Sequence, residues 1–225
     1  MPIRNESWRS DAIAARIRDS KPDGHVFEIE PGLLDPRDVV EVLERALPHD
    51  WEIVNSSGHC SWFFAQMPSR PQDRFLTIRE FGAIGNGISF AMGVAAARPD
   101  RKVVLFDGDG SLMMHVQELE TINRHRLDIL IVVMNDGAYG SELHKLRAEG
   151  MPDDGSVFGY CDFAGVARGF GIDGKTFTKL YDVPKFVAEF AASGGAAVWD
   201  FRVSAKVVSP TIRRAHPRSA EKKAH

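Results

Sequence analysis

The sequence contains little cysteine, little net charge and no long apolar run. Its 2 cysteines, Cys60 and Cys161, lie far apart and show no Cys-x-x-Cys or Cys/His spacing, which gives no zinc motif and is typical of free thiols in a reducing compartment. A formal net charge of -3 provides no basic field for nucleic acid or an anionic membrane. No apolar run reaches the roughly 18 residues that span a bilayer, and residues 1–20 lack the apolar core of a signal peptide. We therefore expect a cytoplasmic protein with no nucleic-acid or membrane partner.

The remaining composition is that of an ordinary globular domain, with 44% hydrophobic and 26% charged residues. A length of 225 residues accommodates one large domain with a buried core. Residues 1–34 include helical spacing from Trp8 to Asp19 and are predicted to be a linker or N-terminal arm. Residues 35–205 are predicted to form the domain. Residues 206–225 are basic and have no apolar period, so we predict a flexible C-terminal tail.

Apolar runs alternate with helical patterns along residues 35–205. Continuous apolar runs at 102–106 and 129–134 predict strands that are buried on both faces. Further strands are predicted at 51–54, 176–178 and 197–203, and helices at 36–47, 60–66, 81–97, 116–126, 141–148 and 183–192. This alternation predicts an α/β fold of three layers, with a mostly parallel sheet and helices on both of its faces.

Two predicted strands end in unusually polar loops, at residues 106–111 and 134–140. Ligands of open parallel sheets bind beyond the carboxyl ends of the strands, and a helix that starts there offers backbone N–H groups to a phosphate. The carboxylates of Asp107, Asp109 and Asp136 would repel that phosphate. A hard cation such as Mg²⁺ between them removes the conflict. The two loops therefore predict a divided site for a metal ion and a diphosphate.

Three blocks of sequence, in order, resemble the thiamine-diphosphate-dependent enzymes. Gly108-Asp109-Gly110 is followed after 24 residues by Asn135-Asp136, which is similar to the family's signature. The intervening helix at 117–124 and the upstream segment at 81–97 resemble the corresponding parts of the family. The resemblance extends over roughly residues 35–205. It is to the C-terminal, diphosphate-binding domain of acetolactate synthase and benzoylformate decarboxylase.

The resemblance implies a metal site and a cofactor site. It implies Mg²⁺ ligands at the Asp109 and Asp136 side chains and the Ala138 backbone carbonyl. It implies thiamine-diphosphate contacts at Gly58, His59, Gly82, Ile84, Gly108, Gly110, Ser111 and Tyr139. Among these, the Gly82 carbonyl would accept from the aminopyrimidine, and Ile84 would be the apolar wedge that bends the cofactor.

Two positions need separate interpretation. Asp136 stands where relatives commonly have Asn, and its extra charge should strengthen metal binding and slightly repel the diphosphate. Glu142 stands where some decarboxylating relatives carry a catalytic Glu, and it is our candidate catalytic residue in this chain. An equally good interpretation of Glu142 is a solvated acid in the first turn of a helix.

The resemblance also implies a missing partner. Relatives activate the cofactor with a Glu on a separate pyrimidine-binding domain, and the residues before Pro36 are too few to form one. We therefore expect a partner domain or subunit that supplies this Glu, a small 2-oxo acid as substrate, and a homo- or hetero-oligomer. The aromatic stretch 62–64 and the segment 83–97 are our candidate interfaces. The chain would be one subunit of a two-gene enzyme or a domain of a longer one.

Other interpretations are open or weaker. A non-catalytic cofactor-binding or regulatory module would keep the same metal and diphosphate contacts. A nicotinamide site is disfavoured because Gly82, Gly85 and Gly87 do not follow an apolar strand. A Ser57/His59/Asp109 hydrolase triad is disfavoured because no Gly-x-Ser-x-Gly motif is present. Three further histidines show no metal spacing and are predicted to lie at the surface: His115, His125 and His144.

Overall fold

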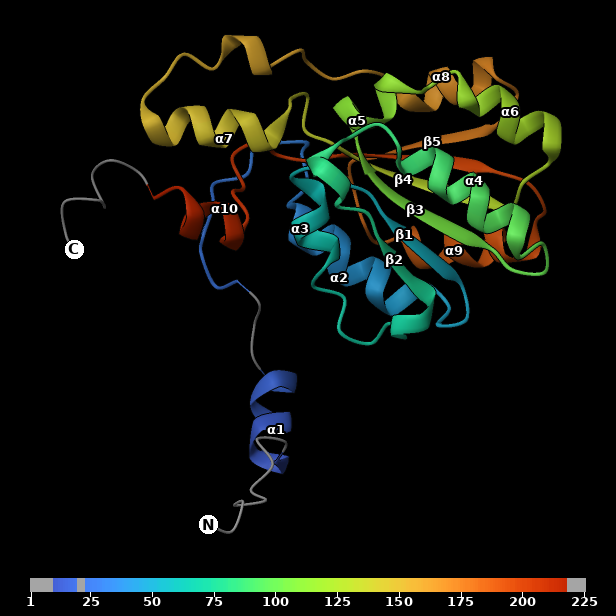
Figure 1. The fold of residues 1–225 in the computed structure, drawn as a ribbon, viewed down its shortest axis with the longest axis horizontal. Helices are drawn as coiled ribbons and strands as arrows, with labels where there is room; N and C mark the ends of the chain where they lie inside the picture. Colours follow the sequence, from blue (N-terminus) through green and yellow to red (C-terminus); the bar gives the residue numbers. More distant parts are fainter. Residues whose placement is uncertain (1–9, 20–22, 218–225) are drawn as a thin grey trace.

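The computed structural model describes residues 10–19 and 23–217, and its centre is a six-stranded sheet (Figure 1). The strand order is β2-β1-β3-β4-β6-β5, and every neighbouring pair is parallel. The strands are β1 (Glu52–Asn55), β2 (Phe75–Thr77), β3 (Val103–Gly108), β4 (Ile129–Asn135), β5 (Asp173–Phe177) and β6 (Ala197–Arg202).

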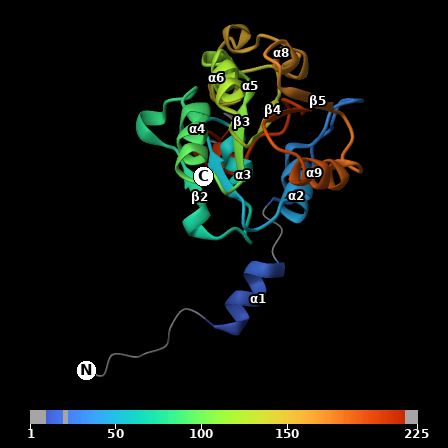
Figure 2. The ribbon, with the colours of Figure 1, turned by 90° about the vertical axis from the view of Figure 1, so that its right-hand side faces the viewer.

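Helices cover both faces of this sheet (Figures 1 and 2). One face carries α2 (Pro36–Ala46), α3 (Cys60–Phe64) and α9 (Val183–Ala192), and the other carries α4 (Gly87–Ala97), α5 (Asp109–Met114), α6 (Glu118–His125) and α8 (Phe163–Gly169). The other helical elements are α1 (Asp11–Asp19), α7 (Gly140–Glu149), α10 (Pro210–Ala215) and the short η1 (Gln72–Arg74), η2 (Glu80–Gly82) and η3 (Asp154–Ser156). The predicted three-layer α/β fold is confirmed. Among the described helices, none has the length and apolar character needed to cross a membrane.

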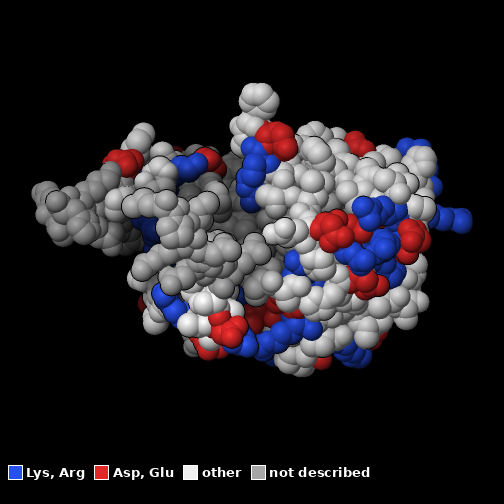
Figure 3. All heavy atoms as spheres, turned by 60° about the horizontal axis from the view of Figure 1, so that its bottom comes forward, with Lys and Arg blue, Asp and Glu red and all other residues white. Residues whose placement is uncertain are grey.

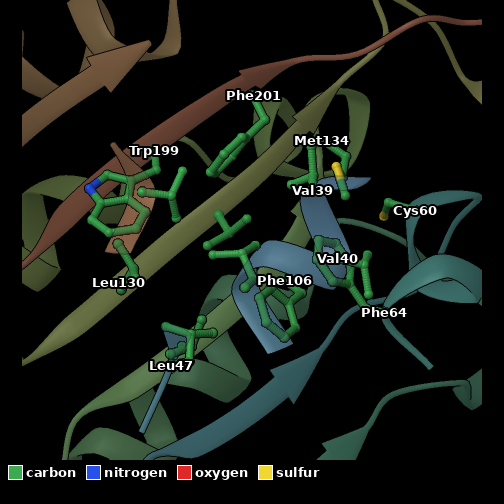
Figure 4. Close-up of a cluster of buried hydrophobic side chains, with 14 of the residues drawn as sticks. Val39, Val40, Leu47, Cys60, Phe64, Phe106, Leu130, Met134, Trp199 and Phe201 are labelled. Carbon is green, nitrogen blue, oxygen red and sulfur yellow. The ribbon is translucent and has the colours of Figure 1, made fainter. Parts of the chain in front are cut away.

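Alternation along the central strands divides the core into two clusters. In β3, Val104 and Phe106 face the α2/α3/α9 layer, and Val103 and Leu105 face the other. Both faces of the strand are therefore apolar, which explains the continuous apolar run. Figure 4 shows the first cluster, in which Phe64 of α3 stacks on Phe106 with ring centroids 3.9 Å apart.

The strand β2 was not predicted. It has only three residues at the edge of the sheet, and Leu76 and Thr77 are exposed. A strand this short and this exposed has no apolar alternation to reveal it. It pairs with β1 through residues 75–77, which extends the sheet by one strand beyond β1.

The predicted interface at residues 62–64 is wrong for two of its three aromatic residues. Phe63 and Phe64 are buried because α3 packs on the sheet, and only Trp62 is partly exposed. In the segment 83–97, by contrast, α4 leaves Phe90 exposed. On the face shown in Figure 3, acidic and basic side chains are intermingled rather than gathered into a field of one sign.

The described part of the N-terminal arm comprises a helix with no buried residue and a segment that packs on the domain. No residue of α1 is buried, and α1 projects away from the sheet (Figure 1). Leu34, in contrast, bridges to Val203 just beyond β6, and Asp23 pairs with Arg213 at 2.7 Å. Trp8, where the predicted helix begins, lies outside the described residues.

Residues 206–217 differ from the predicted flexible tail. They include α10, and Val207, Ser209 and Ile212 are buried. Ser209 is the N-cap of α10, its Oγ accepts a hydrogen bond from the Ile212 N–H at 3.4 Å, and Pro210 is the first helical residue. This Ser-Pro pair resembles the Asp-Pro pair that begins α2 and is typical of a helix start. The prediction of a tail was based on the basic composition of the segment and did not use this pair. Residues 218–225 of the predicted tail lie outside the described residues.

Packing of α8 against β5 should be sensitive to a single methyl group. A Cβ on Gly174 would lie 2.2 Å from the Ala164 carbonyl oxygen, so Gly174→Ala must displace backbone. We expect it to lower the free energy of unfolding by about 1–3 kcal/mol in urea denaturation. Gly194→Ala is the control, because a Cβ added there would meet no atom of the described residues within 4 Å. Equal stability of the two variants would contradict this packing.

Candidate functional site

A small cavity of about 50 Å³ lies at the carboxyl ends of β1, β3 and β4. Eleven of the twelve predicted site residues line it: Gly58, His59, Ile84, Gly108, Asp109, Gly110, Ser111, Asp136, Ala138, Tyr139 and Glu142. Parallel pairing of the three strands brings their ends to one edge of the sheet, so segments about 25 to 50 residues apart meet there. The remaining predicted residue, Gly82, is exposed on η2 and does not line the cavity.

The loops after β3 and β4 are joined through the Asp109 carboxylate. Its Oδ1 accepts a hydrogen bond from the Gly110 N–H at 2.8 Å, and its Oδ2 accepts one from the Gly137 N–H at 2.7 Å. The Asp136 Oδ1 accepts from the Ala138 N–H at 3.2 Å. Both carboxylates are therefore held by backbone donors, from the start of α5 and from the loop between β4 and α7.

The neighbouring Asn135 has a structural contact of its own. Its Nδ2 donates to Asp200 Oδ1 at 2.8 Å and to the Cys161 carbonyl at 2.9 Å. Asp200 is fully buried and pairs with Arg202 at 3.0 Å. The Asn135 side chain thus fixes the end of β4 against β6, and Asp136 is the residue of this pair that reaches the cavity.

Burial raises the pKa of the carboxyl groups at this edge. It raises the pKa of Asp107 to about 6 and that of Asp109 to about 7. The pKa of Asp136 is also well above its usual range, first because of burial and then because of the charge of Asp109. Two buried carboxylates that destabilise one another are relieved by a cation placed between them.

The donor set fits Mg²⁺ only if other oxygens contribute. Within residues 10–19 and 23–217, no three His, Cys, Asp or Glu side chains are grouped to hold a metal ion. The cavity offers two aspartates and backbone carbonyl groups. Mg²⁺ commonly takes one or two carboxylates and completes its shell with phosphate oxygens and water, so this set suits a metal bound together with a phosphate.

Glycine is required where the loops approach one another. A Cβ on Gly110 would lie 2.5 Å from Tyr139 Cε1, and a Cβ on Gly140 would lie 2.6 Å from Asp136 Oδ2. Gly137 has a φ of +72° and packs against the backbone of Gly159. Larger residues would fill the space in which a ligand could meet the backbone N–H groups.

His59 is buried and is held by several contacts. Its Nε2 accepts a hydrogen bond from the Ser209 N–H at 3.0 Å, and its Nδ1 lies 4.0 Å from Asp136 Oδ2. Its ring packs edge-on against His144 with centroids 4.7 Å apart. Burial, followed by the nearby His144, lowers the pKa of His59 well below its usual value. Ser57 Oγ donates to the Ile78 carbonyl instead, so Ser57 and His59 are not paired as in a hydrolase triad.

The surface prediction for His144 is wrong. His144 is 5% exposed, whereas His125 is exposed and His115 is partly exposed. His144 lies four residues after Gly140 on α7, one helical turn away, so it faces the same side as the loop that carries Asp136. The four-residue spacing between Gly140 and His144 could therefore have indicated that His144 is buried near the site.

Glu142 and Ser111 have partners that bear on their predicted roles. Glu142 is exposed in the first turn of α7 and pairs with Lys145 Nζ at 3.2 Å. Ser111 Oγ accepts from the Gly85 N–H at 2.8 Å and lies 3.4 Å from Ser56 Oγ. Ser111 thereby ties α5 to the loop that carries Ile84.

Several cavity residues were missed by the sequence interpretation. They are Pro36, Ser57, Cys60, Phe63, Met134, Gly140, Ser141, Val203, Ser204 and Val207. Most are apolar or small residues from α2, α3 and the chain after β6, where no polar motif marks them. After β6 the chain folds back over the carboxyl ends of the strands, and this places Val203, Ser204 and Val207 at the cavity.

Comparison with known proteins gives a consistent result. The profile of thiamine pyrophosphate enzymes, C-terminal TPP binding domain, matches residues 56–201. The acetolactate synthase isozyme 1 large subunit of Escherichia coli (strain K12) is 33% identical over 150 residues, which cover 66% of this chain and 27% of that protein. The isozyme 2 large subunit of the same organism is 31% identical over 184 residues, which cover 79% and 32%. This chain thus spans about a third of the length of the curated relatives it matches.

A solved structure shares the fold. It is the thiamine diphosphate-dependent 4-hydroxybenzoylformate decarboxylase of Rhodococcus jostii RHA1, with a TM-score of 0.69. The sequences are 24% identical, and the match covers 83% of this chain and 36% of that one. At this identity the similarity concerns the fold.

Neutralising Asp136 should stabilise the metal-free protein at high pH. The folded-state pKa of both aspartates lies above the usual 3.8, so folding takes up protons and stability falls as pH rises from about 4 to about 7. Asp136→Asn keeps an oxygen for the Ala138 N–H and removes the repulsion. We expect it to raise urea stability at about pH 8 in chelator, and to lose most of that gain at about pH 4.

The exposed Asp73→Asn is the control for this comparison and should show little change at either pH. An Asp136→Asn effect of the same size at both pH values would contradict repulsion between Asp109 and Asp136.

Proposed function

Because this chain belongs to the thiamine pyrophosphate enzyme family through its C-terminal TPP-binding domain, we propose that it is the diphosphate- and magnesium-binding component of an acetolactate synthase-like 2-oxo acid decarboxylase or carboligase. The observation that supports this best is the cavity itself. Asp109 and Asp136, from two different strand ends, meet there beside glycines that leave the backbone accessible.

In this proposal the residues of the two loops hold the metal ion and the diphosphate. Asp109, Asp136 and the Ala138 carbonyl are the Mg²⁺ ligands. Cofactor contacts come from Gly58, His59, Gly82, Ile84, Gly108, Gly110, Ser111 and Tyr139. When bound, thiamine diphosphate supplies a nucleophilic thiazolium carbon and accepts the electrons released on cleavage next to a carbonyl. The backbone N–H groups of Gly110 and Ser111 lie in the first turn of α5, where a phosphate is favoured. The Gly110 N–H, which donates to Asp109 Oδ1 in this structure, would turn to the phosphate when Asp109 binds the metal ion.

Glu142 is the third carboxylate that lines the cavity, after Asp109 and Asp136. Its exposure and its pairing with Lys145 place it in contact with solvent. We propose Glu142 as a proton carrier between solvent and a bound 2-oxo acid. The Glu that activates the cofactor is assigned to a pyrimidine-binding partner, because the curated relatives are about three times as long as this chain's match to them.

The partner would cover the exposed apolar side chains near η2. Phe81 is fully exposed with a φ of 55°, a costly backbone conformation for an aromatic residue. Phe90, Met113 and Met114 are exposed in α4 and α5, and Met114 lies against Gly85. We propose that these four residues, together with exposed Gly82, contribute to the surface where an aminopyrimidine-binding partner would complete the site.

Magnesium-dependent binding of thiamine diphosphate tests the cofactor assignment. Calorimetric titration into the purified chain should show binding with Mg²⁺ and none with chelator. Asp109→Ala should abolish this binding while circular dichroism shows an intact fold, because Asp109 is a ligand and joins both loops. Asp73→Ala is the control and should bind normally, because Asp73 is exposed and does not line the cavity. Unchanged affinity in Asp109→Ala would reject the assignment.

If the wild-type chain does not bind the cofactor at all, two interpretations replace the present one. Either the site forms only with the pyrimidine-binding partner, or the chain is a non-catalytic cofactor-binding or regulatory module. Repeating the titration with a pyrimidine-binding domain present separates them, since binding restored by the domain supports the enzyme.

The apolar surface predicts association. We expect the purified chain to self-associate in sedimentation experiments, and Phe81→Asp to weaken that association by at least about tenfold without loss of monomer stability. Tyr181→Asp is the control, because Tyr181 is 76% exposed but lies two residues before α9, which belongs to the opposite layer. A purified chain that stays monomeric at every concentration, or equal effects of the two variants, would reject self-association through this surface.

A further inference from the structure

The chain after β6 donates a hydrogen bond into the cavity wall. The Ser209 N–H donates to His59 Nε2 at 3.0 Å, between residues 150 positions apart, and both residues are buried. A backbone N–H can only donate, so Nε2 offers its lone pair and cannot carry a proton. An imidazole with one acceptor nitrogen has its proton on the other, so Nδ1 of His59 is the N–H.

This proton faces the cavity. Nδ1 lies 4.0 Å from Asp136 Oδ2, which is too far for a hydrogen bond. A Cβ on Gly140 would lie 3.0 Å from Nδ1 and 2.6 Å from that carboxylate oxygen, so glycine keeps the space between them open. His59, Asp136 and Gly140 all line the cavity. Phe63 and His144 hold the ring edge-on, with centroids 5.0 and 4.7 Å away.

The donor is anchored independently of His59. Val207 and Ile212 are buried on either side of Ser209. Ser204 Oγ donates to Glu30 Oε2 at 2.5 Å, and Arg213 pairs with Asp23 at 2.7 Å. These contacts fix the segment to the residues that precede α2, so the Ser209 N–H has a defined position.

We propose that residues 203–215 are a positioning element of the cofactor site, in which the Ser209 N–H holds His59 as its Nδ1–H tautomer and so presents a hydrogen-bond donor to the diphosphate. The identity of that anion rests on the proposed function, whereas the tautomer rests on the hydrogen bond alone. In the other tautomer, Nδ1 would turn a lone pair toward the diphosphate, and a charge-assisted hydrogen bond would be lost.

Two substitutions of the same residue isolate this N–H. Ser209 has a φ of -61°, which proline adopts, so Ser209→Pro removes the N–H with little demand on its own backbone. Ser209→Ala is the matched control, because both variants lose the capping hydroxyl and only one loses the N–H. Both are made in the full chain.

The first readout is the tautomer, from the ring-nitrogen chemical shifts of His59 by NMR. We expect an unprotonated Nε2 and a protonated Nδ1 in the wild type and in Ser209→Ala, and loss of this pattern in Ser209→Pro. The second readout is calorimetric affinity for thiamine diphosphate with Mg²⁺. We expect Ser209→Pro to bind about tenfold more weakly than Ser209→Ala.

The outcomes are distinct. A protonated Nε2 in the wild type, or equal affinity of the two variants, would overturn the proposal. If Ser209→Pro does not fold, scalar coupling between the Ser209 amide nitrogen and His59 Nε2 in the wild type decides whether the bond exists. A wild type that has the expected tautomer but binds no thiamine diphosphate, either alone or with a pyrimidine-binding domain present, would reject the proposed function and the role of the donor, but not the tautomer.

Discussion

The site depends on one buried carboxylate that is bonded to two loops at once. Asp109 accepts from Gly110 at the start of its own helix and from Gly137 in the loop after the next strand. This double contact fixes the distance between the two strand ends. It also brings Asp136 beside Asp109, and their repulsion is the reason that the pair suits a cation. The same close approach of the loops explains why Gly110, Gly137 and Gly140 are glycines, because a side chain at these positions would collide with a neighbouring loop or with its own.

The sequence was informative wherever chemistry is local. Asp109 and Asp136 end apolar runs, and parallel strands place such ends together, so both the fold and the central residues of the candidate site could be predicted. Residues whose position depends on distant packing could not. His144 is drawn inward by the packing of α7, and Ser209 reaches His59 only because the chain after β6 returns over the strand ends. The basic composition of residues 206–225 indicated a flexible tail, although Ser209 and Pro210 begin a helix within it.

The polar and apolar parts of the candidate site differ in how far this chain supplies them. The carboxylates of Asp109 and Asp136 come from the loops after β3 and β4, and backbone donors hold both. Near η2, Gly82 does not line the cavity, and Phe81 is fully exposed with a positive φ. The fold therefore positions the polar groups of the candidate site by itself, whereas the surface near η2 is where the proposed partner would bind.

The contact between His59 and Ser209 has a consequence for how the protein is made. His59 belongs to the first part of the chain, and its hydrogen-bond donor is synthesised 150 residues later. At about 5–20 residues per second, translation needs roughly 8–30 seconds to cover that distance. A chain synthesised through β6 contains every strand of the described sheet and still lacks the donor. Of the segments that line the candidate site, the one that carries Val203, Ser204 and Val207 is thus the last to be synthesised.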